Sequence, residues 1–225
     1  MKNQYVGDIN DYAKYSLLRS LDDVLICWML TPDDERSDGS LTGYLSQPQR
    51  YRHYDPELFD SLLRTFAESR NIQAIEHSGI LPRARFFTAP LVENPPRRAE
   101  YFSSMFDACR LNDLVFFDPD NGLEVPSVPL GRKSSNRYLY WSELSATIEH
   151  GHSAIVYQHF PRANRDAYIL RALESARGFH PELQHCAVFT SRVAYLFFLQ
   201  PTHSNTLNAV RNFSSKWKSL IRYAE

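Results

Sequence analysis

The feature that most constrains this chain is a repeated alternation between short, β-rich apolar runs and segments whose apolar residues recur with a helical period. The strand-like runs before the last quarter of the chain are VLICWML (24–30), IQAIE (72–76), DLVFFD (113–118) and SAIVYQ (153–158). Consecutive parallel strands need a long crossover, usually a helix, because a tight turn cannot join them. The pattern therefore predicts an α/β fold with one doubly wound, mainly parallel sheet.

The expected helices fill the intervals and the end of the chain. Their apolar faces fall at 12–21, 58–66, 101–109, 141–149, 164–177 and 207–221. The last two strand-like runs, CAVF (186–189) and VAYLFFLQ (193–200), are joined by a short turn and predict an antiparallel hairpin. The chain has 225 residues, 43% of them hydrophobic, and shows no internal repeat, so we expect a single domain over residues 1–225.

Charge and cysteine content exclude several classes of protein. The 25 Lys and Arg residues nearly cancel the 26 Asp and Glu residues, so no global field draws the chain to nucleic acid or to a membrane. The three cysteines form no CxxC pair and lie in apolar stretches, which indicates reduced thiols. The N-terminal residues have no apolar signal core, and no apolar run approaches the ~20 residues that span a bilayer. We expect a cytoplasmic protein, with its oligomeric state left open.

The polar sequence DPDNG follows the apolar strand LVFF directly. Asp118 ends the predicted strand, and Pro119 stops it by removing a backbone donor. Ligands of doubly wound sheets bind at the carboxyl ends of the strands, where the loops converge. The same edge is expected to receive the polar residues 31–34, after the first strand, and 157–159, after the fourth, among them Thr31, Asp33, Tyr157 and His159.

Structural explanations compete with the functional ones. DPDNG is also good turn chemistry, because proline fixes one torsion and Asn-Gly supplies a positive φ. Asp33 suits a solvated acidic loop, and Lys14 suits the solvent-exposed face of a helix. His159 is either a base or a satisfied structural histidine. The loop GRKSSNR (131–137), with Arg132 and Lys133, either contacts phosphates or is simply solvated.

Four segments carry a family resemblance: GDINDYAKYSLLRSL, FFDPDNGLE, AIVYQHFP and VAYLFFLQP. In order and spacing they resemble a bacterial family of S-adenosylmethionine-dependent methyltransferases that act on an adenine amino group in large-subunit ribosomal RNA. That family opens with Gly-Asn-x-x-Asp-x-x-Lys-His and carries Asp-Pro-Pro-Tyr after its fourth strand. Gly7, Asp11 and Lys14 match if Asp8 replaces the asparagine, and Tyr15 then stands where the family has a cofactor-contacting histidine.

The resemblance implies roles for the strand-end residues. Asp118 and the carbonyl of Pro119 would accept hydrogen bonds from an exocyclic amine and orient its lone pair toward the methyl group. Asp120 and Asn121 replace the Pro-Tyr of the family, so base stacking would come from another aromatic residue, Tyr157 or Phe160. The implied partner is a nucleic acid or a nucleotide, contacted through the local basic loop.

The cofactor segment departs further from the family. The usual glycine-rich turn after the first strand reads WMLTPDDERSDG here, with Gly39 as its only glycine. Thr31 and Asp33 are expected to hydrogen-bond the aminoacyl or ribose groups of S-adenosylmethionine. Glu76, at the end of the predicted second strand, has the right type for a ribose hydroxyl.

Three classes of function follow from these patterns. The first is a methyltransferase-like enzyme acting on nucleic acid or a nucleotide. The second is a Mg²⁺-dependent phosphodiesterase or nuclease with Asp118, Asp120 and Glu124 as oxygen ligands. The third is a methyltransferase-like fold that binds a partner or small ligand without catalysis, which the missing glycine turn favours.

Overall fold

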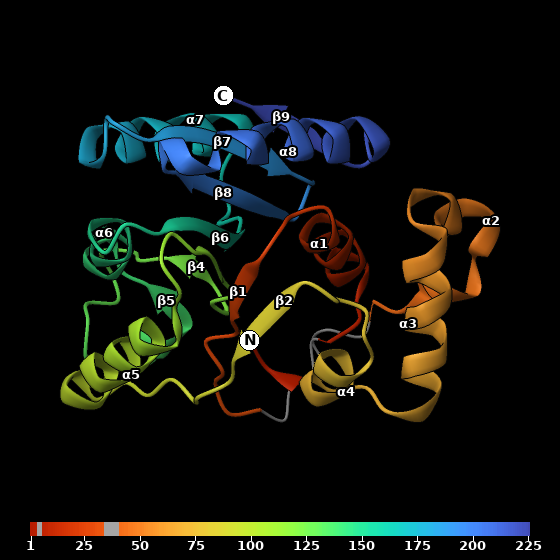
Figure 1. Ribbon diagram of the computed structural model, residues 1–225, viewed down its shortest axis with the longest axis horizontal. Coiled ribbons are helices and arrows are strands. Elements are labelled where there is room, and N and C mark those ends of the chain that lie inside the picture. Colours follow the sequence, from red (N-terminus) through yellow and green to blue (C-terminus); the bar gives the residue numbers. More distant parts are fainter. Residues whose placement is uncertain (4–5, 34–40) are drawn as a thin grey trace.

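The computed structural model of the protein describes residues 1–3, 6–33 and 41–225. Within them lies a seven-stranded sheet of order β2-β1-β3-β6-β8-β7-β9 (Figure 1). Four neighbouring strands are parallel: β2 (Ala84–Phe87), β1 (Val24–Cys27), β3 (Leu114–Phe117) and β6 (Ser153–His159). The chain therefore has the predicted α/β fold, with a mainly parallel sheet.

The C-terminal part of the sheet is antiparallel. The predicted hairpin is confirmed as β7 (Gln184–Phe189) and β8 (Val193–Leu199), and β8 inserts between β6 and β7. A further edge strand, β9 (Arg222–Ala224), pairs antiparallel with β7, and sequence reasoning did not find it. Because β7 runs parallel to β6, the turn between β7 and β8 lies at the same edge of the sheet as the carboxyl end of β6.

Helices cover both faces of the sheet. One apolar cluster joins alternate strand residues to α1 (Ile9–Arg19), α3 (Pro56–Glu68), α4 (Ile72–His77) and α8 (Ser204–Lys216). The other joins the opposite strand face to α5 (Pro95–Ala108), α6 (Trp141–Glu149) and α7 (Arg165–Phe179). Figure 1 shows α1, α3 and α4 to one side and α5 and α6 to the other. Both cores explain why the central strands are continuous apolar runs: every residue of β1 and β3 is buried.

The predicted strand at 72–76 is wrong, because this segment forms helix α4. Asn71 caps α4 by accepting a hydrogen bond from the N–H of Ala74, and Ile72 and Ile75 are buried with the spacing of one helical face. The second parallel strand is instead β2, a half-buried edge strand. Its sequence ARFF is short and contains a charged residue, so it gives a weaker strand signal than a central strand does.

Short elements complete the fold. The helix α2 (Pro48–Tyr51) precedes α3, and a small two-stranded ladder pairs β4 (Gly122–Leu123) with β5 (Tyr138–Leu139). The first strand ends earlier than predicted, at Cys27, and Met29 has a positive φ of 48°. Among the described residues, no helix combines the length and apolar character needed to cross a membrane.

Candidate functional site

Helix α1 brings a buried charge to the carboxyl end of the sheet. Asp8 caps the helix by accepting hydrogen bonds from the backbone N–H groups of Asn10 and Asp11, which aligns the next turn. Asp11 and Lys14 then lie one turn apart on the same face. Lys14 is completely buried, so the solvent-exposed alternative for this lysine is wrong.

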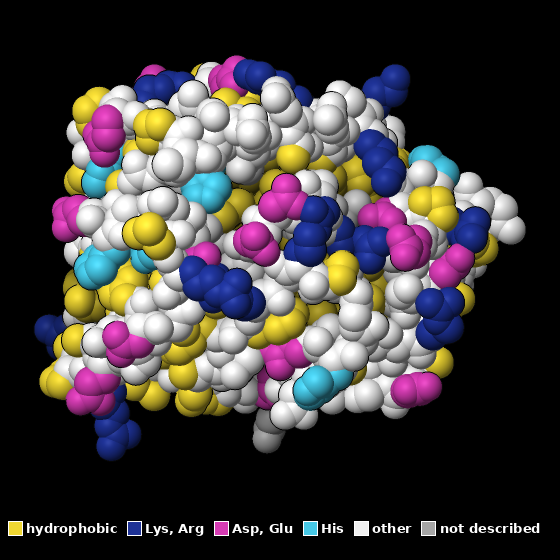
Figure 2. All heavy atoms as spheres, viewed as in Figure 1, with side chains coloured by type: hydrophobic (Ala, Val, Ile, Leu, Met, Phe, Trp, Pro, Cys, Tyr) yellow, Lys and Arg dark blue, Asp and Glu magenta, His cyan; other side chains and the backbone are white. Residues whose placement is uncertain are grey.

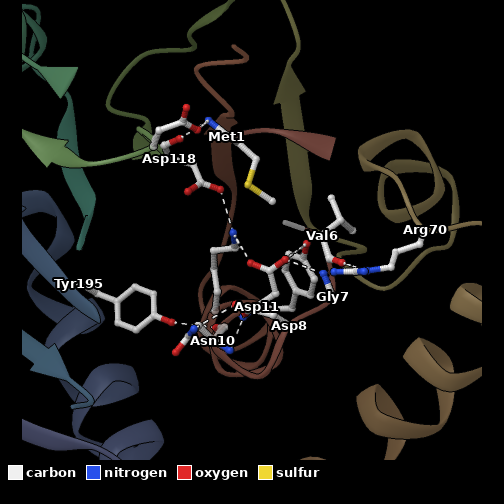
Figure 3. A network of polar contacts seen from close by, with 12 residues as sticks. Met1, Val6, Gly7, Asp8, Asn10, Asp11, Arg70, Asp118 and Tyr195 are labelled. Atoms are coloured by element: carbon white, nitrogen blue, oxygen red, sulfur yellow. Dashed lines mark hydrogen bonds and ion pairs between the residues drawn. The ribbon is translucent and has the colours of Figure 1, made fainter. Parts of the chain in front are cut away.

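The Lys14 ammonium group joins two carboxylates across the fold (Figure 3). Its Nζ lies 2.6 Å from Oδ1 of Asp11 and donates a hydrogen bond of 2.8 Å to Oδ2 of Asp118. The aromatic rings of Tyr157 and Trp28 surround it, with centroids 4.9 and 5.7 Å from Nζ. Burial opposes the charge, but the carboxylates of Asp11 and Asp118 raise the pKa of Lys14 above its usual value. Lys14 therefore remains an ammonium ion that fixes Asp118.

Asp11 is held from three sides and carries an unusual pKa. Its Oδ2 accepts hydrogen bonds from the N–H of Gly7 at 2.7 Å and from the hydroxyl of Tyr15 at 3.2 Å. Burial raises the pKa of Asp11 to about 6, although the Lys14 ammonium group opposes this shift. Tyr15 is itself fully buried and supports Asp11 from behind.

The motif DPDNG, which follows β3, forms a tight turn and also holds Asp118 next to Lys14. Gly122 has a φ of 112°, and a Cβ at this position would lie 2.4 Å from side-chain atoms of Gln158. Gln158 in turn accepts a hydrogen bond from the N–H of Leu123 and donates one to the carbonyl of Asn121. The turn interpretation of DPDNG is thus correct for Gly122, while Asp118 is engaged by Lys14.

The N-terminal residue fills the space beyond β1. The amine of Met1 donates a hydrogen bond to the carbonyl of Asp118 at 2.9 Å (Figure 3). It also donates one to the carbonyl of Met29 at 3.0 Å and lies 3.0 Å from Oδ1 of Asp120. The hydroxyl of Thr31 donates to Oδ2 of Asp120 at 2.7 Å. The ends of β1 and β3 are therefore linked through Met1 and Asp120.

A crevice of about 370 Å³ opens at this edge, within the usual range of small-molecule sites. Its charged lining comprises Asp8, Asp11, Asp118, Asp120, Lys14 and Arg192, with the Met1 amine beside them. Pro119, Asn121, Tyr157 and His159 complete the part that the sequence predicted. In Figure 2, acidic and basic side chains lie side by side over α1 on the viewed face, whereas Asp11, Lys14 and Asp118 of the crevice are buried.

Other predicted residues lie elsewhere. Glu76 is on α4, where its Oε1 accepts a hydrogen bond from the indole N–H of Trp28 at 2.8 Å. Arg132 and Lys133 are exposed in a loop that does not line the crevice, and neither does the exposed Asp33. Gly39 lies outside the described residues.

The predicted magnesium site does not assemble. Glu124 points to another element, because its Oε1 accepts a hydrogen bond of 3.0 Å from the N–H of Trp141 at the start of α6. Over residues 1–3, 6–33 and 41–225, no group of three or more His, Cys, Asp or Glu side chains could hold a metal ion. The prediction that Asp118, Asp120 and Glu124 share one ion is wrong.

Sequence reasoning missed several lining residues. Asp8 carried a usable signal, since an aspartate before a helical period is a typical N-cap. The sequence signal for Arg192 was weaker: this residue lies in the turn of the predicted hairpin, and that turn reaches the same edge of the sheet. The position of Met1 has no local signal, since it depends on contacts with Met29 and Asp118 that are far apart in the sequence.

Fold and site together define an α/β protein with a polar crevice at the carboxyl ends of β3 and β6. No family model matches the sequence, and no curated protein matches it. Among solved structures, the chain matches "Crystal Structure of Human Methyltransferase-like protein 13 in complex with SAH" at 14% identity. The match covers 90% of this chain and 88% of that chain with a TM-score of 0.34, so the fold class stands on the strand order and not on this match.

Proposed function

We propose that the protein is methyltransferase-like and acts on the exocyclic amine of a nucleotide or nucleic-acid base. The observation that carries the proposal is the buried Lys14–Asp118 pair beneath an acidic crevice. Lys14 holds the Asp118 carboxylate at a fixed position at the end of β3. A carboxylate accepts hydrogen bonds and donates none, so such a crevice selects ligand groups that donate them.

The wall of the crevice suits a flat base. Tyr157 presents an aromatic ring beside Lys14, and His159 lies two residues further along β6, at the rim. The two rings pack edge to face with their centroids 5.1 Å apart, and a base stacked against this pair would direct its amine toward the aspartates. Stacking on an aromatic ring contributes roughly 1 to 3 kcal/mol. Tyr157 thereby replaces the aromatic residue that DPDNG lacks.

S-adenosylmethionine does not fit the present arrangement of the β1 end. Trp28 and Met29 are completely buried there, and Met1 is 4% exposed. Glu76, the expected ribose ligand, binds the Trp28 indole and lines a different cavity of about 380 Å³. Binding of that cofactor between β1 and β3 requires Met1 to leave its place.

Because Met1, Trp28 and Met29 fill the space at the end of β1, the structure favours a second candidate function. A methyltransferase-like protein that binds the same amine-bearing ligand without transferring a methyl group needs only the crevice. Both candidates share the recognition by Asp118 and differ in whether the protein binds S-adenosylmethionine. Reduced cysteines are consistent with either protein in the cytoplasm.

Calorimetric titration with matched nucleosides tests the recognition. Adenosine and cytidine carry the amine, whereas inosine and uridine carry a carbonyl oxygen that would face the carboxylates. We expect the amine-bearing member of each pair to bind at least tenfold more tightly, because the carbonyl oxygen of the other member would face the carboxylate oxygens and form no hydrogen bond with them. In Asp118→Asn the amide oxygen still accepts a hydrogen bond and part of the preference remains, whereas Asp118→Ala abolishes it.

Thermal unfolding with S-adenosylmethionine and S-adenosylhomocysteine separates the two candidates. A ligand at 100 times its dissociation constant stabilises the fold by about 2.7 kcal/mol. A response to these compounds supports the enzyme, and its absence in a protein that still discriminates adenosine from inosine supports the binding protein. Equal binding of adenosine and inosine would contradict the proposal as a whole.

A further inference from the structure

A second cavity adjoins the crevice. It has a volume of about 500 Å³ and lies between the start of α1, the segment from Gly43 to Tyr51, the β7–β8 turn and the end of α8. Asn10, Leu41 and Arg192 line both cavities. The two spaces are therefore parts of one groove that meets at Arg192.

The charge of the groove changes along its length. The crevice is lined by four aspartates, Asp8, Asp11, Asp118 and Asp120, together with Lys14 and the Met1 amine, which pair with three of them. The second cavity has two arginines, Arg50 and Arg192, and no acidic residue among its described lining. Both arginine side chains are exposed, and no ion pair joins either of them to a carboxylate in the described part of the chain.

Aromatic side chains form the wall of the second cavity. Tyr44 stacks on Tyr12 with a centroid distance of 5.3 Å, and Tyr51 packs edge-on against Tyr44. The guanidinium carbon of Arg50 lies 5.1 Å from the centroid of the Tyr51 ring, which holds this arginine over the cavity wall. The buried hydroxyl of Tyr44 has no hydrogen-bond partner among the described residues.

We propose that the second cavity is the phosphate subsite for the nucleotide whose base amine enters the acidic crevice. The groove is acidic where the amine binds and basic where the phosphate binds, so only a ligand with both groups is complementary along its whole length. Arg192, at the junction, and Arg50, further out, are the residues that bind the phosphate. Guanidinium groups suit this role because their donors match the phosphate oxygens in pairs. This inference rests on the proposed function for the orientation of the nucleotide.

The groove takes either a free nucleotide or one nucleotide of a single strand, since both present the same 5′-phosphate next to the sugar. A mononucleotide and a short single-stranded oligonucleotide distinguish them. An oligonucleotide that binds more tightly than adenosine 5′-monophosphate, with a steeper loss of affinity in salt, identifies a strand as the source. Equal affinity and equal salt dependence identify the free nucleotide.

Titration of the wild-type protein with adenosine, adenosine 5′-monophosphate and inorganic phosphate tests the subsite. We expect the monophosphate to bind about tenfold more tightly than adenosine, because charge-assisted hydrogen bonds are the stronger kind. Arg50→Gln and Arg192→Gln should each remove most of this gain. Arg132→Gln, in a loop that lines neither cavity, is the matched control and should change nothing.

The outcomes separate this inference from the proposed function. Equal affinity for adenosine and its monophosphate, or an unchanged gain in Arg50→Gln and Arg192→Gln, overturns the phosphate subsite even if adenosine is preferred over inosine. A phosphate gain that depends on both arginines, without any preference for the amine, supports the subsite and overturns the proposed role of Asp118. If Arg132→Gln instead removes the tighter binding of the monophosphate, the phosphate binds at the basic loop 131–137, and the inference is overturned.

Discussion

At the scale of single residues, the centre of the site is the buried ammonium group of Lys14. Lys14 is enclosed by two carboxylates and aromatic rings, unlike an exposed ion pair, which contributes about 0 to 1 kcal/mol. Removing one partner of a buried pair typically costs about 3 to 5 kcal/mol, because the other charge remains buried. The pattern Gly-Asp-x-x-Asp-x-x-Lys revealed that Asp11 and Lys14 share a helix face. It did not reveal their burial, which depends on the distant Asp118.

Asp11 gives a residue-scale prediction about pH. Its pKa in the folded protein is about 6, raised by burial above the ordinary value of 3.8. The folded state therefore binds more protons than the unfolded state between about pH 4 and 6, and stability is lost as the pH rises through this window. Asp11→Asn lacks this titration. We expect the free energy of unfolding of the wild type, measured in urea relative to Asp11→Asn, to fall from pH 4 to pH 7.

The control for this experiment is Asp107→Asn, at an exposed position of α5, which should show no such trend. A wild type that gains stability over Asp11→Asn as the pH rises would mean that attraction to Lys14 outweighs burial at Asp11. The folded pKa of Asp11 would then lie below its ordinary value.

At the scale of elements, residues at the ends of β3 and β6 line the crevice, and the turn after β3 has a strict conformational requirement. The turn from β3 into β4 brings Asn121 and Leu123 to the Gln158 side chain, so the crevice and the β4–β5 ladder share one support. The sequence predicted both uses of DPDNG as alternatives. In the structure Gly122 serves the turn, while Asp118 faces Lys14 and lines the crevice.

Replacement of Gly122 tests this division of labour. Gly122→Ala places a Cβ at a φ of 112° and 2.4 Å from Gln158, so we expect a loss of roughly 2 kcal/mol or more in the free energy of unfolding. Gly178→Ala is the matched control, since the methyl group that alanine adds near the end of α7 would meet no other part of the protein within 4 Å. That change should be neutral or stabilise the protein by up to about 1 kcal/mol. Equal effects of both substitutions in urea unfolding would contradict the turn assignment.

At the scale of the whole molecule, the central sheet was predictable and its margins were not. The strands β1, β3 and β6 are buried on both faces and therefore read as uninterrupted apolar runs. The edge strands β2 and β9 are partly exposed, which weakens their apolar pattern, and an apolar segment of α4 was assigned to a strand. The groove could not be predicted from the sequence. Its walls come from α1, α2, the β7–β8 turn and the end of α8, and these segments meet only in the folded protein.

The cysteines give a prediction that concerns the fold as a whole. Cys27 and Cys186 lie in β1 and β7 and are completely buried, and burial raises the pKa of each thiol to about 12. Only the thiolate attacks a thiol reagent, so both residues should stay unlabelled until the sheet opens. Cys109, at the end of α5, is only partly buried and should be modified first, although burial also raises its pKa, to about 11.

Mass spectrometry of the protein after labelling at increasing urea concentrations measures this order. Because β1 and β7 belong to one sheet with a core on each face, Cys27 and Cys186 should become reactive together, at the midpoint of global unfolding. Within the described sheet, the antiparallel part, β8-β7-β9, pairs with the parallel part through the ladder between β6 and β8. If Cys186 is labelled at a clearly lower urea concentration than Cys27, that ladder is a boundary between two cooperative units. The sheet would then open at its C-terminal edge before the strands that carry the crevice.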